Sequence, residues 1–143
     1  MRISDAVAPL NPLFPTHMPA TLDTIIIYAR NPIATATFYC RYFDYHSSGI
    51  MEEGLITLSP TSSGTTLLIH QAAKSIKLGH AGLKLMFTVE DVEAYKAKSA
   101  ALGLEFDSTH QAQGYCFANV KDPDGNSISI SSRAFRAAPE SLT

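Results

Sequence analysis

The fold is indicated by the stretch Lys121-Asp122-Pro123-Asp124-Gly125-Asn126-Ser127-Ile128-Ser129-Ile130-Ser131, in which a tight turn runs directly into a strand. Proline fixes φ for a turn, aspartate side chains can bond nearby backbone amides, and Gly125 tolerates a positive φ. From Ser127 onward isoleucine and serine alternate, so the isoleucines point to one face of the strand and the serines to the other. One face should pack in a core and the other should face something polar.

The composition indicates a globular protein and argues against nucleic-acid and membrane binding. The chain has 143 residues, a hydrophobic content of 45% and a net charge of −2, which suit one globular domain and give no electrostatic footprint for nucleic acid. No apolar run approaches the roughly 20 residues that span a bilayer, and no signal peptide is evident, so we expect no membrane partner and a cytoplasmic location. Cys40 and Cys116 are expected to be reduced and packed.

Three segments are predicted. Residues 1–20 contain four prolines without sustained periodicity, which predicts an extended proline-rich arm. Residues 21–133 form the folded domain, and residues 134–143 form a loose tail. The arm could wrap a partner subunit, and a dimeric interaction module that works through this arm is one reading of the chain.

The first half of the domain predicts a strand, a helix and a hairpin. The strand covers residues 21–30, the helix covers residues 32–43 after an Asn31 cap, and the hairpin strands cover residues 54–58 and 65–71. The helix spacing predicts that one face packs on a sheet, with the residues Ile33, Ala36, Thr37, Cys40 and Phe43, and that Phe38, Tyr39 and Tyr42 broaden this apolar surface.

The second half repeats this plan. A strand over residues 83–89 precedes a helix that starts at Asp91 and ends near Leu102, and strands follow over residues 115–120 and 127–132. The two halves align at a nearly constant offset, with Thr24 on Lys84, Ile27 on Phe87, Asn31 on Asp91 and Gly64 on Gly125. We therefore predict an α+β fold of two βαβββ modules that form a curved mixed sheet with the helices outside and a concave inner face.

This element order, the Asn31-Pro32 and Glu90-Asp91 helix starts, Phe38-Tyr39 in the first helix and the Asp-Pro-Asp-Gly-Asn turn resemble the vicinal oxygen chelate superfamily. That family includes glyoxalase I, bleomycin-resistance proteins and extradiol dioxygenases, and the resemblance covers residues 21–133. It implies the fold, a small-molecule ligand and a homodimer built by pairing modules. It says less about the reaction, because one scaffold hosts many chemistries.

The resemblance also implies positions for a metal centre, since metal-dependent members carry His or Glu ligands on four inner strands. These positions fall on Thr24, Leu68, Lys84 and Ser129 in this sequence. Hydroxyls bind divalent ions weakly, Leu cannot bind them, and Lys would have to lose its proton. We therefore expect the usual metal centre, and any other cofactor, to be absent.

His70 is the best remaining candidate for a general base or a ligand-binding imidazole, because it shares a strand face with Leu68. A hydrogen-bonded histidine near a strand end is the structural alternative. Lys84 either pairs with an anionic group of a ligand or points to solvent with its stem over apolar surface. His80 and His110 lie in loops that could border the pocket, and His46 and His17 are weaker candidates.

Aromatic and hydroxyl residues complete the predicted pocket. Tyr28, Tyr115 and Phe117 have the parity to reach the inner face, where aromatic rings could sandwich a flat ligand; for Phe117 we favour core packing. Whether the protein is an enzyme stays open. The favoured function is binding of a small organic molecule, as a sequestering protein or a metal-independent enzyme, through the residues Thr24, Tyr28, His70, Lys84, Tyr115 and Ser129. The alternative is a metal-dependent lyase, isomerase or dioxygenase in which His70 and a second histidine, such as His80 in a shifted register, form an atypical site.

Overall fold

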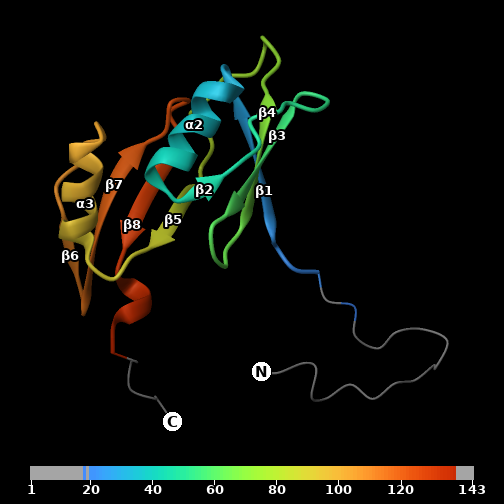
Figure 1. Cartoon of the computed structure of the whole chain (residues 1–143). Coiled ribbons are helices and arrows are strands. Elements are labelled where there is room, and N and C mark those ends of the chain that lie inside the picture. Colours follow the sequence, from blue (N-terminus) through green and yellow to red (C-terminus); the bar gives the residue numbers. More distant parts are fainter. Residues whose placement is uncertain (1–17, 19, 138–143) are drawn as a thin grey trace, which may run out of the picture.

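The computed structural model of the protein describes residue 18 and residues 20–137. Most of the predicted arm over residues 1–20 and the last six residues of the predicted tail lie outside the described residues. The described part consists of two modules with the same order of elements (Figure 1).

The first module has one helix and four strands: β1 (Thr24–Ala29), α2 (Pro32–Tyr42), β2 (Tyr45–His46), β3 (Leu55–Pro60) and β4 (Thr66–Gln71). The second module repeats this order: β5 (Lys84–Thr88), α3 (Val92–Ala101), β6 (His110–Ala112), β7 (Tyr115–Lys121) and β8 (Ser127–Ser131), followed by a short 3₁₀ helix, η1 (Arg133–Phe135). The predicted α+β class and the internal repeat are confirmed.

The strands form two mixed four-stranded sheets, in the orders β1-β4-β3-β2 and β5-β8-β7-β6. In each sheet the first strand pairs with the last in parallel, and the other pairs are antiparallel. Thr24 lies opposite Thr66, and its repeat partner Lys84 lies opposite Ser127. The repeat seen in the sequence therefore holds in the strand register. Among the described residues no ladder joins β1 to β5, so the two sheets meet along unpaired edges.

Both helices begin where the sequence predicts. The Asn31 side chain accepts a hydrogen bond from the Ala34 N–H at 3.2 Å, and the Asp91 side chain accepts one from the Ala94 N–H at 3.0 Å. These caps satisfy N–H groups that the first helical turn leaves without partners.

The predicted buried face of α2 is wrong in part. Ile33, placed in the core by the helical spacing, is 60% exposed, and Thr37 is exposed as well. Thr35, which was not predicted to pack, is buried at 1% exposure, and Tyr39, which was predicted to belong to the apolar surface, is buried at 0%. Apolar periodicity cannot show that these two side chains have hydrogen-bond partners in the second module, and those partners make their burial favourable.

The short strands β2 and β6 were not predicted. Residues 45–46 and 110–112 have no apolar alternation long enough to indicate a strand, and each is held at a sheet edge by its neighbour β3 or β7.

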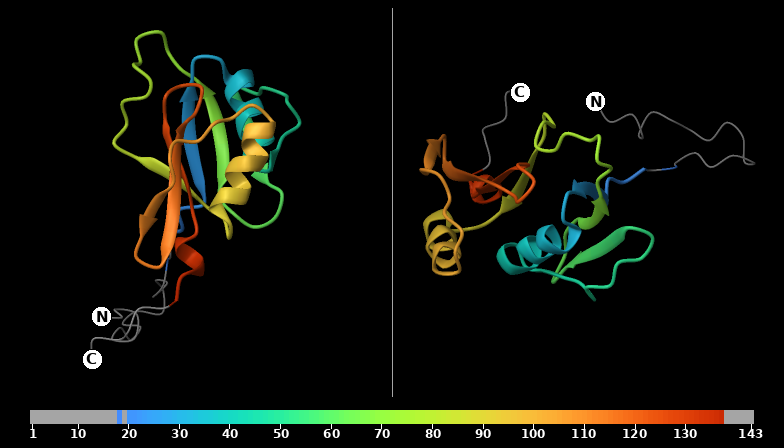
Figure 2. Two further views of the ribbon diagram at one scale, coloured as in Figure 1. Left: turned by 90° about the vertical axis from the view of Figure 1, so that its left-hand side faces the viewer. Right: turned by 90° about the horizontal axis from the view of Figure 1, so that it is seen from above.

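One hydrophobic core serves both modules. Ile27, Ile69, Ile128 and Ile130 belong to it from the two sheets, together with Tyr39 from α2. The ring of Phe43, after α2, stacks on Phe87 of β5 with centroids 4.3 Å apart. Both helices lie on one side of the two sheets, and the segment 72–83 that connects the modules lies on the other side (Figure 2).

A set of side-chain hydrogen bonds joins α2 to the turn between β7 and β8, and we call it the carboxylate clasp. The Tyr39 hydroxyl donates to Asp122 Oδ2 at 2.7 Å, and the Thr35 hydroxyl donates to Asp124 Oδ2 at 2.6 Å. The backbone N–H of Arg30 donates to Asp124 Oδ1 at 3.0 Å. Burial, reinforced by the Asp122 carboxylate, raises the pKa of the Tyr39 hydroxyl, so this hydroxyl stays protonated and remains a donor.

The same carboxylates also shape the turn. Asp122 Oδ1 accepts the backbone N–H groups of Asp124 and Asn126 at 2.8 and 2.9 Å. Gly125 has φ +86°, and the Cβ of any other residue there would stand 3.3 Å from the Cα of Gly79. The positive φ and this tight approach both favour a glycine at this position.

Replacing Tyr39 with Phe should lower the free energy of unfolding by about 1–2 kcal/mol, because the buried Asp122 carboxylate loses a donor. Urea denaturation measures this change. Tyr28→Phe is the matched control, since the Tyr28 side chain is 44% exposed, and its effect should be small. Equal losses in the two variants would mean that the clasp contributes nothing measurable to stability.

Candidate functional site

The face of the sheets opposite the helices is the surface on which the predicted site residues lie, and we call it the open face. In β1 the side chains of Ile27 and Ala29 are buried toward the core, so the alternating residues Thr24, Ile26 and Tyr28 point to the open face. Ile26, Tyr28 and Met86 are 48%, 44% and 55% exposed there. Large apolar side chains that gather on an exposed sheet face favour a binding surface.

Tyr28 and His70 form the most developed pair on the open face. The two residues lie opposite each other in the parallel β1–β4 ladder. Their rings are tilted by 41° with centroids 5.2 Å apart. Leu55 of β3 is the next residue in the same row, because it lies opposite His70. The row offers an aromatic and aliphatic platform with one imidazole in it.

The orientation of the His70 ring is fixed by its own strand. His70 Nδ1 lies 2.8 Å from the backbone carbonyl oxygen of Gln71. A carbonyl can only accept, so Nδ1 carries the proton and donates, and Nε2 of the neutral ring keeps a free lone pair. His70 therefore offers a hydrogen-bond acceptor to a ligand.

The open face of the second sheet is more polar. Lys84 Nζ donates a hydrogen bond to Asn119 Oδ1 of β7 at 3.1 Å, so the ammonium group has a side-chain partner. Ser129 lies opposite Met86 and Asn119 and is only 2% exposed. Tyr115 is half-buried beside Phe117, with ring centroids 6.4 Å apart.

The residues at the family's metal positions do not fit a divalent ion. The Thr24 hydroxyl donates a hydrogen bond to the Asp23 carboxylate at 3.0 Å, and the Lys84 ammonium group donates one to Asn119. Ser129 offers a neutral hydroxyl, and Leu68 offers no side-chain atom that could bind a metal ion. Within residues 20–137 no group of three or more His, Cys, Asp or Glu side chains could hold a metal ion. The donor chemistry at these positions does not suit Zn²⁺ or another transition metal.

The other histidines are dispersed. His80 lies in the connecting segment, four positions before β5 begins at Lys84, so the strand does not start early enough to bring it into register. It lines a cavity of about 200 Å³ together with Tyr28. His110 lies on β6 and stacks on Phe117 at 5.0 Å, and His46 lies on β2. His17 falls outside the described residues.

The structure thus gathers the predicted site residues into two groups. Tyr28 and His70 are in contact on the first sheet, and Thr24 lies at the start of the same strand. Lys84 and Ser129 lie on adjacent strands of the second sheet, with Tyr115 on the strand beyond. The sequence did not predict Asn119, which accepts the Lys84 hydrogen bond, as a site residue. Asn119 lies on the same face of its strand as Phe117, and this spacing could have indicated it.

Two further findings concern the whole described chain. Both cysteines are free, and burial raises the pKa of the Cys40 thiol. Among the described helices, none has the length and the apolar character that crossing a membrane requires.

A comparison with models of protein families identifies the family of this chain. The model of the Glyoxalase/Bleomycin resistance protein/Dioxygenase superfamily matches residues 21–130. The chain belongs to this superfamily. A search of curated proteins gives no significant match.

Solved structures of the superfamily fold are similar to this chain over most of their length. TnmS3, an antibiotic binding protein from Streptomyces sp. CB03234, gives a TM-score of 0.66 at 20% identity, covering 80% of this chain and 97% of its own. UcmS2 gives a TM-score of 0.68 at 17% identity, covering 80% and 99%.

A lactoylglutathione lyase from Agrobacterium tumefaciens gives a TM-score of 0.62 at 19% identity, covering 80% of this chain and 94% of its own. A binding protein and an enzyme therefore share this superfamily fold, and the fold by itself does not choose between the two activities.

The position of the proton on His70 gives a direct test of this geometry. In the neutral ring we expect the Nδ1–H form, because Nδ1 faces the Gln71 carbonyl. Long-range ¹H–¹⁵N correlation spectra above the titration range of the ring report the protonated nitrogen. His46 is the internal comparison, because it is exposed and its side chain has no hydrogen bond to another described residue. An Nε2–H form of His70 would contradict the predicted acceptor.

Proposed function

We propose that this protein binds a small, flat organic molecule on the open face, without a divalent metal ion, as a cytoplasmic homodimer. It acts as a sequestering protein or as a metal-independent enzyme. The observation that carries the proposal is the Tyr28–His70 pair, which stands accessible beside exposed apolar side chains while the family's metal positions hold poor ligands.

The chemistry of the pair suggests the kind of ligand. The Tyr28 ring and the side chains of Ile26 and Leu68 supply apolar contact for a planar body. His70 Nε2 accepts a hydrogen bond, so a hydroxyl or N–H group on the ligand would be recognised there. A phenol-bearing aromatic molecule matches both requirements. The similarity to an antibiotic binding protein makes antibiotic-sized organic molecules reasonable first ligands to screen.

A homodimer is proposed because the open face exposes apolar side chains that a second copy could cover. Leu83 is 77% exposed and lines one cavity together with the exposed Ile26 and Tyr28, and Met86 of β5 is 55% exposed. Burying such side chains contributes about 25 cal/mol per Å² of apolar surface removed from water. A second copy over this face would also enclose the bound molecule.

Ligand binding can be tested with 2-naphthol as a probe and 2-methoxynaphthalene as its matched control. The control has the same rings but cannot donate a hydrogen bond to His70 Nε2. We expect 2-naphthol to bind about tenfold more tightly, which corresponds to ~1.4 kcal/mol, and His70→Ala to abolish the difference. Tyr28→Leu should weaken both probes. Binding is followed by the shifts of backbone amides in ¹H–¹⁵N spectra.

Two outcomes would overturn this proposal. The first is equal affinity of the native protein for the two probes. The second is a stoichiometric transition metal in protein purified without chelators, if His70→Ala removes that metal; a metal-dependent lyase, isomerase or dioxygenase would then be the better reading.

The oligomeric state is a separate test. Sedimentation analysis should show a dimer, and Ile26→Lys should shift it toward monomer because it places a charge in the covered face. Ile33→Lys is the control: Ile33 is 60% exposed on α2, on the helix side of the molecule, and its substitution should leave the dimer intact. A monomeric native protein would contradict the dimer.

A further inference from the structure

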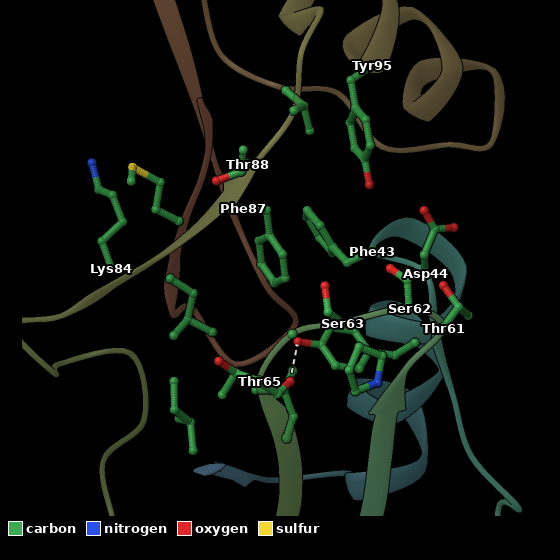
Figure 3. Close-up of a pocket in the computed structure, with 18 residues that line it drawn as sticks. Phe43, Asp44, Thr61, Ser62, Ser63, Thr65, Lys84, Phe87, Thr88 and Tyr95 are labelled. Carbon is green, nitrogen blue, oxygen red and sulfur yellow. Dashed lines mark hydrogen bonds between the residues drawn. The ribbon is translucent and has the colours of Figure 1, made fainter. Parts of the chain in front are cut away.

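A second cavity lies where the two sheets meet, and neither Tyr28 nor His70 lines it. β1 and β5 have no ladder between them, and Ile25 and Leu85 from these strands line a cleft of about 550 Å³. We call it the seam cleft (Figure 3). Its other walls come from the end of α2, the β3–β4 turn, β5 and α3.

The floor of the seam cleft is aromatic. Phe43 and Phe87 are stacked at 4.3 Å, and Tyr45 meets Phe87 edge-on at 6.3 Å. Tyr95 of α3 lies nearly parallel to Phe43 at 6.3 Å. Phe87 and Tyr95 are half-buried, so these rings keep surface that a ligand could cover. Four rings, from residues 43–45 at the junction of α2 and β2, from β5 and from α3, therefore converge on one cleft.

The rim is hydroxylic. The β3–β4 turn contributes Thr61, Ser62, Ser63 and Thr65, and β5 contributes Thr88. Within residues 20–137 none of these five hydroxyl groups takes part in a hydrogen bond with another residue. The bond drawn in Figure 3 runs instead from the Tyr45 hydroxyl to the backbone carbonyl of Thr65, at 2.7 Å. The rim can accept or donate hydrogen bonds to polar substituents of a ligand.

Asp44 places a carboxylate beside the rings. It follows α2 with φ +56°, a conformation that aspartate tolerates better than most residues. Its backbone carbonyl accepts the N–H of Thr61 at 3.1 Å, which ties the rim to the helix end. Its carboxylate has no hydrogen-bond partner among the described residues, and Figure 3 shows it on the same side of the cleft as Tyr95. Burial, with a further contribution from Asp44, raises the pKa of Tyr95 to about 12.

The cations near the cleft do not neutralise this carboxylate. Lys84 donates to Asn119, and in Figure 3 its side chain extends away from the aromatic group. Lys98 Nζ lies over the Tyr95 ring, 5.7 Å from its centroid. Aromatic faces and a carboxylate without an ion pair are the combination that recognises organic ammonium groups.

We propose that the seam cleft binds a small aromatic molecule carrying a protonated amine, with its apolar body against Phe87 and Tyr95 and its ammonium group at Asp44. The seam cleft adjoins the open face, since Lys84 and Met86 line it, but Tyr28 and His70 do not, so the two proposed ligand sites use different contact side chains. The ligand class also differs, since His70 selects a hydrogen-bond donor and the seam cleft selects a positive charge.

Acridine orange, a planar aromatic cation at neutral pH, is the probe, and 8-anilinonaphthalene-1-sulfonate is the anionic comparison. Fluorescence titration at low salt should show binding of the cation, with Asp44→Asn weakening it about tenfold. Asparagine also tolerates the positive φ of this position, so the fold should be retained. Glu53→Gln is the matched control: it removes the same charge at a residue with φ +53° that does not line the seam cleft, and it should leave the affinity unchanged.

Phe87→Leu provides a second variant that keeps an apolar side chain but removes an aromatic face, and it should also weaken acridine orange. Amide shifts on binding should fall in residues 43–45, 61–65 and 85–88. Equal weakening by Asp44→Asn and Glu53→Gln, tighter binding of the anion in the same residues, or shifts confined to Tyr28 and His70 would each overturn the proposal. If the protein did not distinguish 2-naphthol from 2-methoxynaphthalene, the proposal for the Tyr28–His70 pair would be wrong. The acridine orange result would not change, so the two proposals can be rejected separately.

Discussion

The carboxylate clasp between α2 and the β7–β8 turn is the constraint on which the relation of the two modules depends. Tyr39 and Thr35 lie in the first module, and Asp122 and Asp124, their acceptors, lie in the second. A buried carboxylate is costly unless several donors surround it, and Asp122 receives donors from Tyr39, Asp124 and Asn126. The same residues that reverse the chain before β8 therefore also position the first helix.

The clasp and the Phe43–Phe87 stack hold the two modules together on the helix side, and the connecting segment 72–83 lies on the side of the open face. The sheets themselves share no hydrogen-bonded ladder among the described residues, so side chains alone define the seam between them. That division leaves two surfaces of different character: a broad open face with an imidazole and exposed apolar side chains, and a narrow cleft with aromatic walls and a carboxylate. One fold can carry different functions, because the side chains of such surfaces can differ while the backbone fold stays the same.

Local sequence rules succeeded where neighbouring residues decide the structure. The Asn31 and Asp91 caps and the glycine turn at Gly125 follow from short-range chemistry. The same rules failed in part for α2, where they placed Ile33 and Thr37 in the core and missed the burial of Thr35. They also missed the two-residue strand β2, which exists because β3 pairs with it. In each failure the deciding partner lies far away in the sequence.

The sequence by itself determined the duplicated α+β architecture, the superfamily and the unsuitable residues at the metal positions, because turns, caps and strand alternation are local properties. Only the tertiary structure decided which side chains meet. It placed Tyr28 beside His70, fixed the imidazole through the Gln71 carbonyl, gave Lys84 an amide partner and covered Ser129. It also brought Phe87 of β5 and Tyr95 of α3 to the segment 43–45 that contains Asp44, since such contacts depend on how helices and sheets pack and no spacing along the chain encodes them.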